Sequence, residues 1–284
     1  MRGPAPSPPP SPPFDFLSLE DRVWIMGVIN ATPDSFYADS RSRDLEGAAA
    51  KAREMAEQGA DVIDIGGEST RPGASPVSLA EELNRALPLI DRLRERWPAM
   101  PLSIDTQKAE VARRAWERGI RLINDVSALR HDPAMADVVA ESRCAVVLMH
   151  MQGTPPTMQE NPCYRDVIDA LKAFFEERLA YAVQRNIPER NIVLDPGIGF
   201  GKTRDHNIAI LKRLSELAVL GRPLLIGVSR KSFIGGPPEM RLEGSLAANL
   251  WAVSRGALGL RVHDVEATRR ALSMWQELSA PPRE

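Results

Sequence analysis

Short runs of apolar residues recur along the chain and alternate with longer stretches of helical periodicity. Each run is almost continuously apolar, as expected for parallel strands that are covered on both faces of a sheet. The runs that we interpret as strands occupy residues 24–30, 62–67, 102–106, 121–126, 144–150, 191–196, 224–229 and 259–263.

The stretches between these runs place apolar residues three or four positions apart. The clearest is 164–186, where Ile168, Leu171 and Phe175 contribute to one apolar stripe. The same period occurs in residues 107–118, 205–219 and 243–257. Strands that alternate with helices in this way predict an α/β fold, an eight-stranded parallel (β/α) TIM-type barrel in a single domain. An open, doubly wound sheet is the alternative.

The N-terminal segment differs in composition from the rest of the chain. Residues 1–13 contain seven prolines and almost nothing apolar to bury, so we expect a disordered Pro-rich tail. No comparable segment divides the interior. We therefore interpret residues 14–280 as one catalytic barrel domain.

Charge and composition exclude several classes of protein. The 36 basic and 38 acidic residues give a net charge of −2, which leaves no excess of positive charge for nucleic acid. No apolar run reaches the ~18–20 residues that span a bilayer, and the N-terminus lacks a secretory signal pattern. The two cysteines form no paired motif, so we expect a cytoplasmic protein. From the charge balance and the lengths of the apolar runs, we expect it to bind neither nucleic acid nor membrane.

Polar residues sit at the C-terminal edge of nearly every predicted strand, the face at which the loops of a barrel build its active site. They are Asn30, Asp64, Glu68, Asp105, Asn124, Asp125, His150, Asp195, Ser229, Lys231, Arg261 and His263. Helix capping is the alternative explanation, and it suits Ser78 and Asp264 before later helices. It does not account for a lysine, an arginine and a histidine at strand ends, so we interpret the set as a whole as functional, without assigning each of its members to the site.

The residue types in this set suit a flat heterocycle beside an anion. Carboxylates and amides can bind the edge of a ring that offers several donors and acceptors. Arg261 and His263 are two apart on the last strand, so their side chains point to one side. Together with Thr70, Arg71 and a metal ion on Asn30, they predict a pocket for a diphosphate.

The segment DPGIGFGKT at residues 195–203 resembles a phosphate-binding loop but departs from it at Pro196, where GxxxxGK requires glycine. We expect its three glycines to let the backbone approach a ligand closely and to present Phe200 and Lys202.

Eight segments of the chain carry a resemblance to a known family. They are MGVINATPDSF (26–36), DIGGESTRPGA (64–74), SIDT (103–106), NDVSAL (124–129), LMHMQGTPPTMQ (148–159), DPGIGFGKT (195–203), GVSRKSFIG (227–235) and RVHDV (261–265). In this order, they resemble the dihydropteroate synthases of folate biosynthesis, a pterin-binding family with a β/α-barrel fold. The resemblance covers the chain from about residue 22 to its end.

The resemblance implies a transferase in which 4-aminobenzoate displaces diphosphate from (7,8-dihydropterin-6-yl)methyl diphosphate. It implies catalytic roles for Asp105, Lys231, Arg261 and His263. The pterin diphosphate would be bound by Thr70, Arg71, Asp105, Asn124, Met149, Asp195, Gly227, Lys231, Arg261 and His263. The aminobenzoate would be bound by Phe36, Arg71, Pro72, Phe200 and Ser232. Asn30 would ligate Mg2+, and the protein would form a homodimer.

Two loops have little to bury. Residues 31–45 and 69–78 are rich in serine, proline and charge, so we expect both to act as mobile lids. The family commonly has a Gly-Gly pair close to where Ser40-Arg41 stands here.

Several other histidines, cysteines, tryptophans and lysines are given structural or surface roles. We expect structural or surface roles for His150, His206, Cys144 and Cys163, core or subunit contacts for Trp251 and Trp275, and solvated positions for Lys108 and Lys212.

Three functional hypotheses remain open. The first is the synthase. The second is a pterin-binding methyltransferase module of related fold, which would have no diphosphate to hold and therefore no use for SRKSF and RVHDV. The third is a non-catalytic barrel that acts as a partner protein. The presence of the expected ligand positions argues against the third.

Overall fold

The computed structural model describes residues 22–31, 41–70 and 73–280. In these residues, eight parallel strands form one sheet. The strands are β1 (Trp24–Asn30), β2 (Val62–Gly66), β3 (Leu102–Asp105), β4 (Leu122–Asp125), β5 (Ala145–Met149), β6 (Ile192–Asp195), β7 (Leu225–Ile226) and β8 (Gly259–Val262). Each lies within a predicted run. The predictions for the tail at 1–13 and for residues 14–21 lie outside the described residues.

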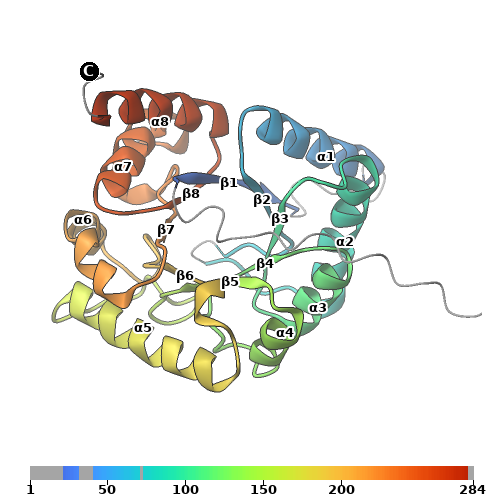
Figure 1. Ribbon diagram of the computed structural model, residues 1–284, viewed down its shortest axis with the longest axis horizontal. Coiled ribbons are helices and arrows are strands. Elements are labelled where there is room, and N and C mark those ends of the chain that lie inside the picture. The colour runs from blue at the N-terminus through green and yellow to red at the C-terminus, as the bar shows by residue number, and fades with distance from the viewer. Residues whose placement is uncertain (1–21, 32–40, 71–72, 281–284) are drawn as a thin grey trace, which may run out of the picture.

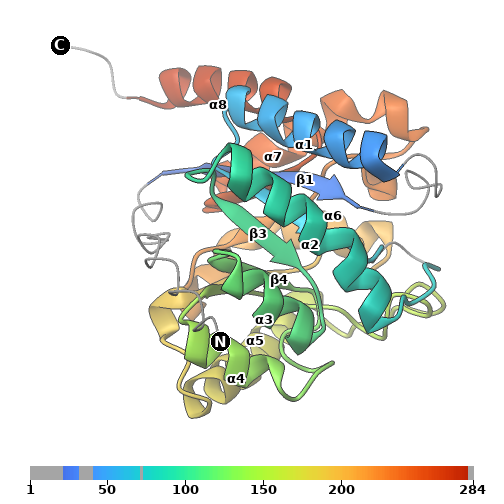
Figure 2. The same ribbon diagram turned by 90° about the vertical axis from the view of Figure 1, so that its right-hand side faces the viewer.

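The sheet curves into a barrel. Its order is β6-β5-β4-β3-β2-β1-β8-β7, and a parallel bridge between Leu194 and Leu224 joins the two edges. Figure 1 shows the helices as a ring around the strands, and Figure 2 shows the barrel from the side. The predicted TIM-type barrel is therefore confirmed, and the open doubly wound sheet is excluded.

The helices follow the strands as the alternation predicts. They are α1 (Arg41–Glu57), α2 (Leu79–Arg96), α3 (Ala109–Glu117), α4 (Met135–Ser142), α5 (Val167–Gln184), α6 (Arg204–Lys212), α7 (Leu242–Ser254) and α8 (Val265–Ser279). Local chemistry fixes several of their ends. Asp166 caps α5 by accepting from the backbone N–H of Ile168 and of Asp169. Ser78 caps α2 as predicted, by accepting from Glu81.

Three local predictions need correction. The helix expected at 205–219 ends at Lys212 and continues as a 3-10 helix over Leu214–Leu220, where Leu214 and Leu217 bury the same side at three-residue spacing. Helix α1 begins at Arg41, so the end of the 31–45 loop is helical, while 32–40 lie outside the described residues. Asp264 does not cap α8 through its side chain, because its carboxylate pairs with Arg230.

The interior of the barrel is apolar at one end and polar at the other. Inward positions near the strand starts form one buried cluster: Trp24, Met26, Val62, Leu122, Ala145, Val147, Val193 and Leu225. Because side chains alternate along a strand, Asp64 and Asn124 point inward two positions beyond Val62 and Leu122. The apolar cluster is thus the floor beneath a polar layer at the strand ends.

Candidate active site

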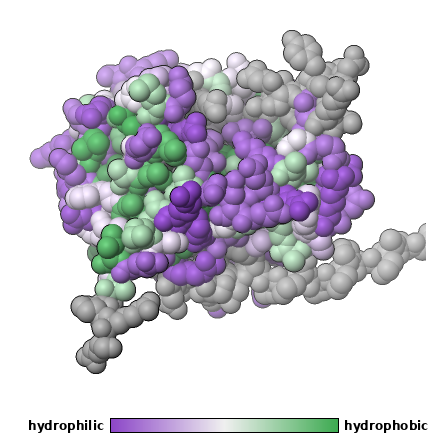
Figure 3. Space-filling view, turned by 90° about the horizontal axis from the view of Figure 1, so that it is seen from above, coloured by the Kyte–Doolittle hydropathy of each residue, from purple (hydrophilic) through white to green (hydrophobic). Residues whose placement is uncertain are grey.

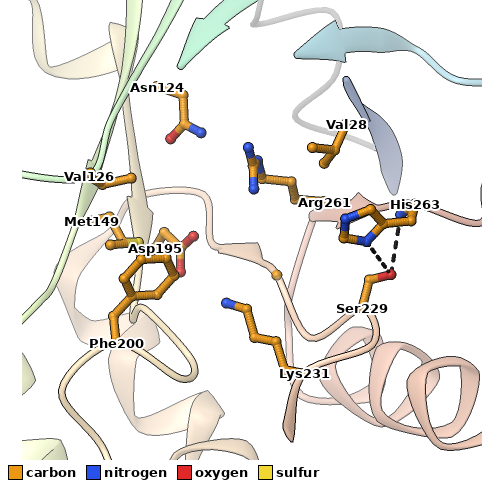
Figure 4. A pocket seen from close by; sticks show the side chains of 11 residues that line it. Val28, Asn124, Val126, Met149, Asp195, Phe200, Ser229, Lys231, Arg261 and His263 are labelled. Carbon is orange, nitrogen blue, oxygen red and sulfur yellow. Dashed lines mark hydrogen bonds between the residues drawn. The ribbon is translucent and has the colours of Figure 1, made fainter. Parts of the chain in front are cut away.

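The strand ends surround one pocket. Its lining comes from five strands and from the loops after β4, β6, β7 and β8: Val28, Asn124, Val126, Met149, Asp195, Phe200, Gly227, Ser229, Lys231, Arg261 and His263. Figure 4 shows Asn124, Arg261 and Lys231 directed into the same space from different elements. The polar residues predicted at strand ends therefore meet, as the parallel barrel requires.

A buried ion-pair network forms one side of the pocket. Arg261, on β8, donates from Nε to Oδ2 of Asp64 at 2.8 Å and from Nη2 to Oδ2 of Asp105 at 2.7 Å. Asn124 donates from Nδ2 to the same Asp64 oxygen at 3.1 Å. Both carboxylates are almost fully buried, where an unpaired charge would be very costly. The guanidinium is the counter-ion that allows the two carboxylates to face one interior.

Burial and charge shift the proton affinities of this network. Burial raises the pKa of Asp105 to about 7, with Arg261 opposing the rise and Asp64 adding to it. For Arg261, burial alone lowers the pKa, but the Asp64 and Asp105 carboxylates outweigh it and the pKa is raised overall. Arg261 therefore stays charged, while Asp105 changes its charge near neutral pH.

Lys231 and Asp195 form the opposite side. Lys231 donates to the backbone oxygen of Ile198 and lies 4.6 Å from the centre of the Phe200 ring. Burial lowers the pKa of Lys231 to about 8, although the Asp195 charge acts in the other direction. Asp195 accepts from the Gly197 N–H at 2.7 Å, and burial raises its pKa, with Lys231 opposing. This side thus offers one cation and one carboxylate beside an aromatic ring.

His263 lies at the rim. Its backbone N–H donates to Ser229 Oγ at 3.2 Å, and its Nδ1 lies 3.0 Å from the same oxygen (Figure 4). Ser229 therefore fixes the orientation of the imidazole. On β1, the Asn30 side chain is also close to the network. A Cβ built on Gly66 would lie 3.7 Å from Asn30 Oδ1 and 3.8 Å from Asp105 Oδ2.

The glycine-rich segment after β6 packs against the protein itself, which corrects the prediction that it approaches a ligand. A Cβ at Gly197 would lie 2.0 Å from the backbone oxygen of His150, and Gly197 has φ +67°. Lys202 is 3% exposed and contacts His150 Nδ1 at 2.9 Å and the Phe200 oxygen at 3.0 Å. The glycines thus allow close packing of two loops. Phe200 faces the pocket, and Lys202 does not.

Lys108 is also not the solvated residue that we predicted. Its Nζ contacts Glu68 Oε2 at 2.6 Å and Glu82 Oε2 at 2.5 Å, and Glu82 also accepts from the Thr106 hydroxyl. Glu68 accepts in addition from the Val77 N–H at 3.1 Å. Glu68 and Val77 stand at the two ends of the loop that carries Thr70, so their hydrogen bond holds these ends together. Lys108 connects the loop to the segment that follows β3.

Most of the other residues with predicted structural or surface roles lie where those roles require. His150 is buried against Phe174, and Cys144 is buried at the start of β5. Cys163 and Lys212 are exposed. Trp275 packs against the core, while Trp251 is 43% exposed on α7.

Most of the predicted site residues that the structure describes come together. Asn124, Met149, Asp195, Phe200, Gly227, Lys231, Arg261 and His263 line the pocket, and Asp105 contacts Arg261. Thr70 is half-buried in the loop after β2, and Ser232 is exposed just after Lys231. Phe36, Arg71 and Pro72 lie outside the described residues.

Our choice of site residues omitted four that the structure places here. Val28, Val126 and Ser229 line the pocket, and Asp64 lies behind Arg261. Asp64 and Ser229 are among the polar residues predicted at strand ends, but the family resemblance assigns neither of them a contact with substrate or metal. Strand alternation could have indicated the position of Asp64. Asp64 and Gly66 are two positions apart and therefore face the same side of β2, and Gly66 pairs in register with Asp105.

Comparisons with known proteins agree with this site. The family model described as "Pterin binding enzyme" matches residues 26–263, a span that runs from β1 to the end of β8 and includes the residues that line the pocket. The chain thus falls in the class of pterin-binding barrel enzymes. It is 44% identical to the dihydropteroate synthase of Synechocystis sp. over 266 residues, which cover 92% of each chain.

Solved structures give the same result. The dihydropteroate synthase of Xanthomonas albilineans with 4-aminobenzoic acid is 47% identical, with a TM-score of 0.86 over 93% of this chain and 95% of that one. The same enzyme in complex with 7,8-dihydropteroate gives a TM-score of 0.82 at 43% identity, with the same coverage. The chain belongs to the dihydropteroate synthase family.

Lys231→Ala is expected to weaken pterin binding about tenfold, because it removes the cation that accompanies Asp195 on this side of the pocket. Calorimetry with 6-hydroxymethylpterin, which lacks the diphosphate, measures the effect directly. Lys212→Ala, an exposed lysine on α6, is the control and should bind like the unaltered protein. Equal affinities for all three proteins would remove Lys231 from the pterin site.

Proposed function

We propose that this protein condenses (7,8-dihydropterin-6-yl)methyl diphosphate with 4-aminobenzoate to give 7,8-dihydropteroate and diphosphate, as a transferase of folate biosynthesis. One observation carries this proposal. A chain 44% identical to a dihydropteroate synthase brings carboxylates, an amide, a lysine and an arginine into one pocket. This donor and acceptor set suits the edge of a pterin ring.

The pterin ring is assigned to the deep part of the pocket. Asp105, Asn124, Asp195 and Lys231 would bind its edge, with Met149 and Gly227 as walls. In the reaction, the amine nitrogen bonds to the methylene carbon, and the carbon–oxygen bond breaks with its electron pair going to diphosphate. The nitrogen then releases a proton to solvent. Because an aromatic amine is already nucleophilic, no strong base is needed.

Electrostatic stabilisation is the main contribution that we assign to the protein. The methylene carbon becomes electron-poor as diphosphate departs, and a conjugated pterin ring can share this positive charge. The buried carboxylates of Asp105 and Asp195 favour such charge because a low-dielectric interior strengthens their field. Thr70, Arg71, Arg261 and His263 are assigned to the departing diphosphate.

Magnesium is part of this proposal. In the described residues, no three His, Cys, Asp or Glu side chains are grouped so that they could hold a metal ion. The Asn30 amide oxygen would instead hold Mg2+ together with diphosphate oxygens and water, a donor set that suits this ion. Bound there, Mg2+ would offset the negative charge of the leaving group.

The aminobenzoate is assigned to the outer part of the mouth. Phe200 is the described residue that links this subsite to the pterin pocket, since its ring lies beside Lys231. Ser232 follows on the exposed side, and Phe36, Arg71 and Pro72 complete the set that the family resemblance implies. Of the two predicted lids, residues 41–45 belong to the first turns of α1, and residues 32–40 and 71–72 lie outside the described residues.

The methyltransferase alternative is not favoured, because the curated relatives that match most of the chain are dihydropteroate synthases. An assay for diphosphate release separates the hypotheses. The purified protein, supplied with the pterin diphosphate, Mg2+ and 4-aminobenzoate, should release diphosphate and form dihydropteroate in equal amounts. Absence of both products, or diphosphate release that does not require 4-aminobenzoate, would contradict the proposal.

The rate should fall as the pH drops below about 7. The Asp105 carboxylate is the active form, and its raised pKa of about 7 means that it gains a proton as the pH falls through that value. Arg261 opposes the rise in pKa, and Asp64, Glu82 and Asp125 add to it. The pH dependence of kcat/KM for the pterin diphosphate tests this. A rate that stays level from pH 8 to pH 5 would contradict it.

We also propose that the protein is a cytoplasmic homodimer. Figure 3 shows an apolar patch on the side of the molecule where Figure 1 places α7 and α8. Exposed apolar side chains on these helices include Trp251, Met274 and Leu278, the last 79% exposed. Sedimentation equilibrium at micromolar concentration should give twice the chain mass, and the mass of one chain would contradict the dimer.

Across the described ranges, no helix is long and apolar enough to cross a membrane.

A further inference from the structure

Asp64 is a fully buried carboxylate next to the pocket. It lies inside the barrel at mid-strand in β2 and is 0% exposed. Its Oδ2 accepts from Arg261 and from Asn124, and its Oδ1 has no hydrogen-bond partner in the described residues. Asp64 does not line the pocket, so its effect on a ligand must act through the two residues that it holds.

Both of those residues belong to the pocket wall. Arg261 and Asn124 come from β8 and β4, so the Asp64 carboxylate connects strands that are not neighbours in the sheet. Because Asn124 donates its amide N–H to Asp64, its amide oxygen is left to face the pocket as an acceptor. Because Arg261 donates Nε to Asp64, its guanidinium is held at a fixed depth.

The charge balance gives Asp64 a second effect. Arg261 bridges Asp64 and Asp105, so one positive charge faces two carboxylates. This group of three has a net charge of −1 when both carboxylates are ionised. If the Asp64 charge were removed, the positive charge of Arg261 would be balanced by Asp105 alone. The Asp105 carboxylate would then no longer stabilise positive charge on the pterin.

We propose that Asp64 is a positioning residue for the pterin site: it orients the Arg261 guanidinium and the Asn124 amide and keeps the Asp105 charge from being cancelled. This inference rests on the proposed function, because it takes the ligand of the pocket to be a pterin. It assigns Asp64 no contact with the substrate.

Asp64→Asn is the direct test, because it removes the charge and keeps the shape of the side chain. We expect the KM for the pterin diphosphate and the dissociation constant of 6-hydroxymethylpterin to rise about 10- to 100-fold. The KM for 4-aminobenzoate should stay within about twofold, because the hydrogen bonds of Asp64 go to Arg261 and Asn124 and not to Phe200 or Ser232, the described residues of that subsite. The acid limb of kcat/KM should move to lower pH, because a charge that raises the Asp105 pKa is lost.

Ser103→Ala is the matched control. Ser103 is fully buried, pairs in register with Asp64 on the neighbouring strand and makes no side-chain hydrogen bond in the described residues. It should leave pterin binding and the pH profile unchanged. If Asp64→Asn lowers only thermal stability, and its pterin binding and pH profile match those of Ser103→Ala, then Asp64 has a structural role alone and the inference is wrong.

A measurement on the unaltered protein covers the case in which Asp64→Asn does not fold. In protein labelled with ¹⁵N-arginine, the Arg261 Nε proton, identified by its loss in Arg261→Lys, should exchange slowly with water before and after pterin binding. Fast exchange in both states would overturn the inference. If the unaltered protein releases no diphosphate with 4-aminobenzoate, the proposed function fails instead, so the two failures can be told apart.

Discussion

Asp105→Asn is expected to lower kcat about 100- to 1000-fold, the effect of removing a preorganised charge from a buried reaction site. The substitution keeps the size of the side chain and removes the negative charge that faces Arg261. Steady-state kinetics with both substrates saturating measures the loss. Turnover near that of the unaltered enzyme would remove the electrostatic role of Asp105.

Asp61 provides a matched control for this substitution. It precedes β2 at the opposite end of the barrel, where its carboxylate pairs with Arg269 at 2.6 Å and with Arg22 at 2.8 Å. Asp61→Asn therefore also breaks an arginine–carboxylate contact at a strand end, but far from the pocket. We expect it to retain kcat within about twofold while losing some stability. A similar loss of kcat in both variants would mean that the effect is one of folding.

Gly197→Ala is expected to destabilise the protein by about 3–5 kcal/mol, near the upper end of single-substitution effects. The added Cβ would lie 2.0 Å from the His150 backbone oxygen, and φ at this position is +67°. Neither the backbone of β5 nor the loop that carries Phe200 can move away without opening the pocket wall. Denaturant unfolding followed by circular dichroism gives the change in free energy.

Gly221→Ala separates the clash from the backbone strain. Gly221 has φ +62°, almost the same as Gly197, but a Cβ built there meets nothing within 4 Å. Its replacement should therefore cost only the strain of a left-handed alanine, about 1–2 kcal/mol. If the two variants lose the same amount, close packing between the two loops does not explain Gly197.

The sequence predicts the barrel and the polar mouth well because one periodic signal controls both. Buried parallel strands are nearly continuously apolar, so a polar residue at the end of such a run is conspicuous. Asp105, Asn124 and Asp195 were recognisable for this reason, and the barrel brings the three together. Arg261 and His263 followed from the two-residue period of a strand.

Asp64 was harder to assign because it lies inside an apolar run, where its partners cannot be read from nearby residues. Its bond to Arg261 joins residues 197 positions apart, and only the closed sheet makes them neighbours. The same limit explains Lys108 and Lys202. Lys108 was predicted to be solvated and Lys202 to be presented to a ligand. Instead, groups from distant parts of the chain hold both of them: Glu68 and Glu82 hold Lys108, and His150 holds Lys202.

The glycine-rich segment shows a different limit. Closely spaced glycines indicate that something approaches the backbone, but they do not indicate whether this is a ligand or the protein itself. Here the approaching groups are the backbone oxygens of His150 and Gln152, which would lie 2.0 Å and 2.5 Å from a Cβ on Gly197 and Gly201. This packing orders the loop so that Phe200 can line the pocket.

The central claim is that one pocket at the strand ends binds the pterin next to the place where diphosphate departs. A crystal structure of the protein soaked with a pterin bearing a 6-methyl phosphate tests it most directly. We expect the ring edge within hydrogen-bond distance of Asn124 and Asp195, and the phosphate toward His263 and Asn30. A ring bound elsewhere on the molecule, or one whose phosphate points away from His263, would contradict the account.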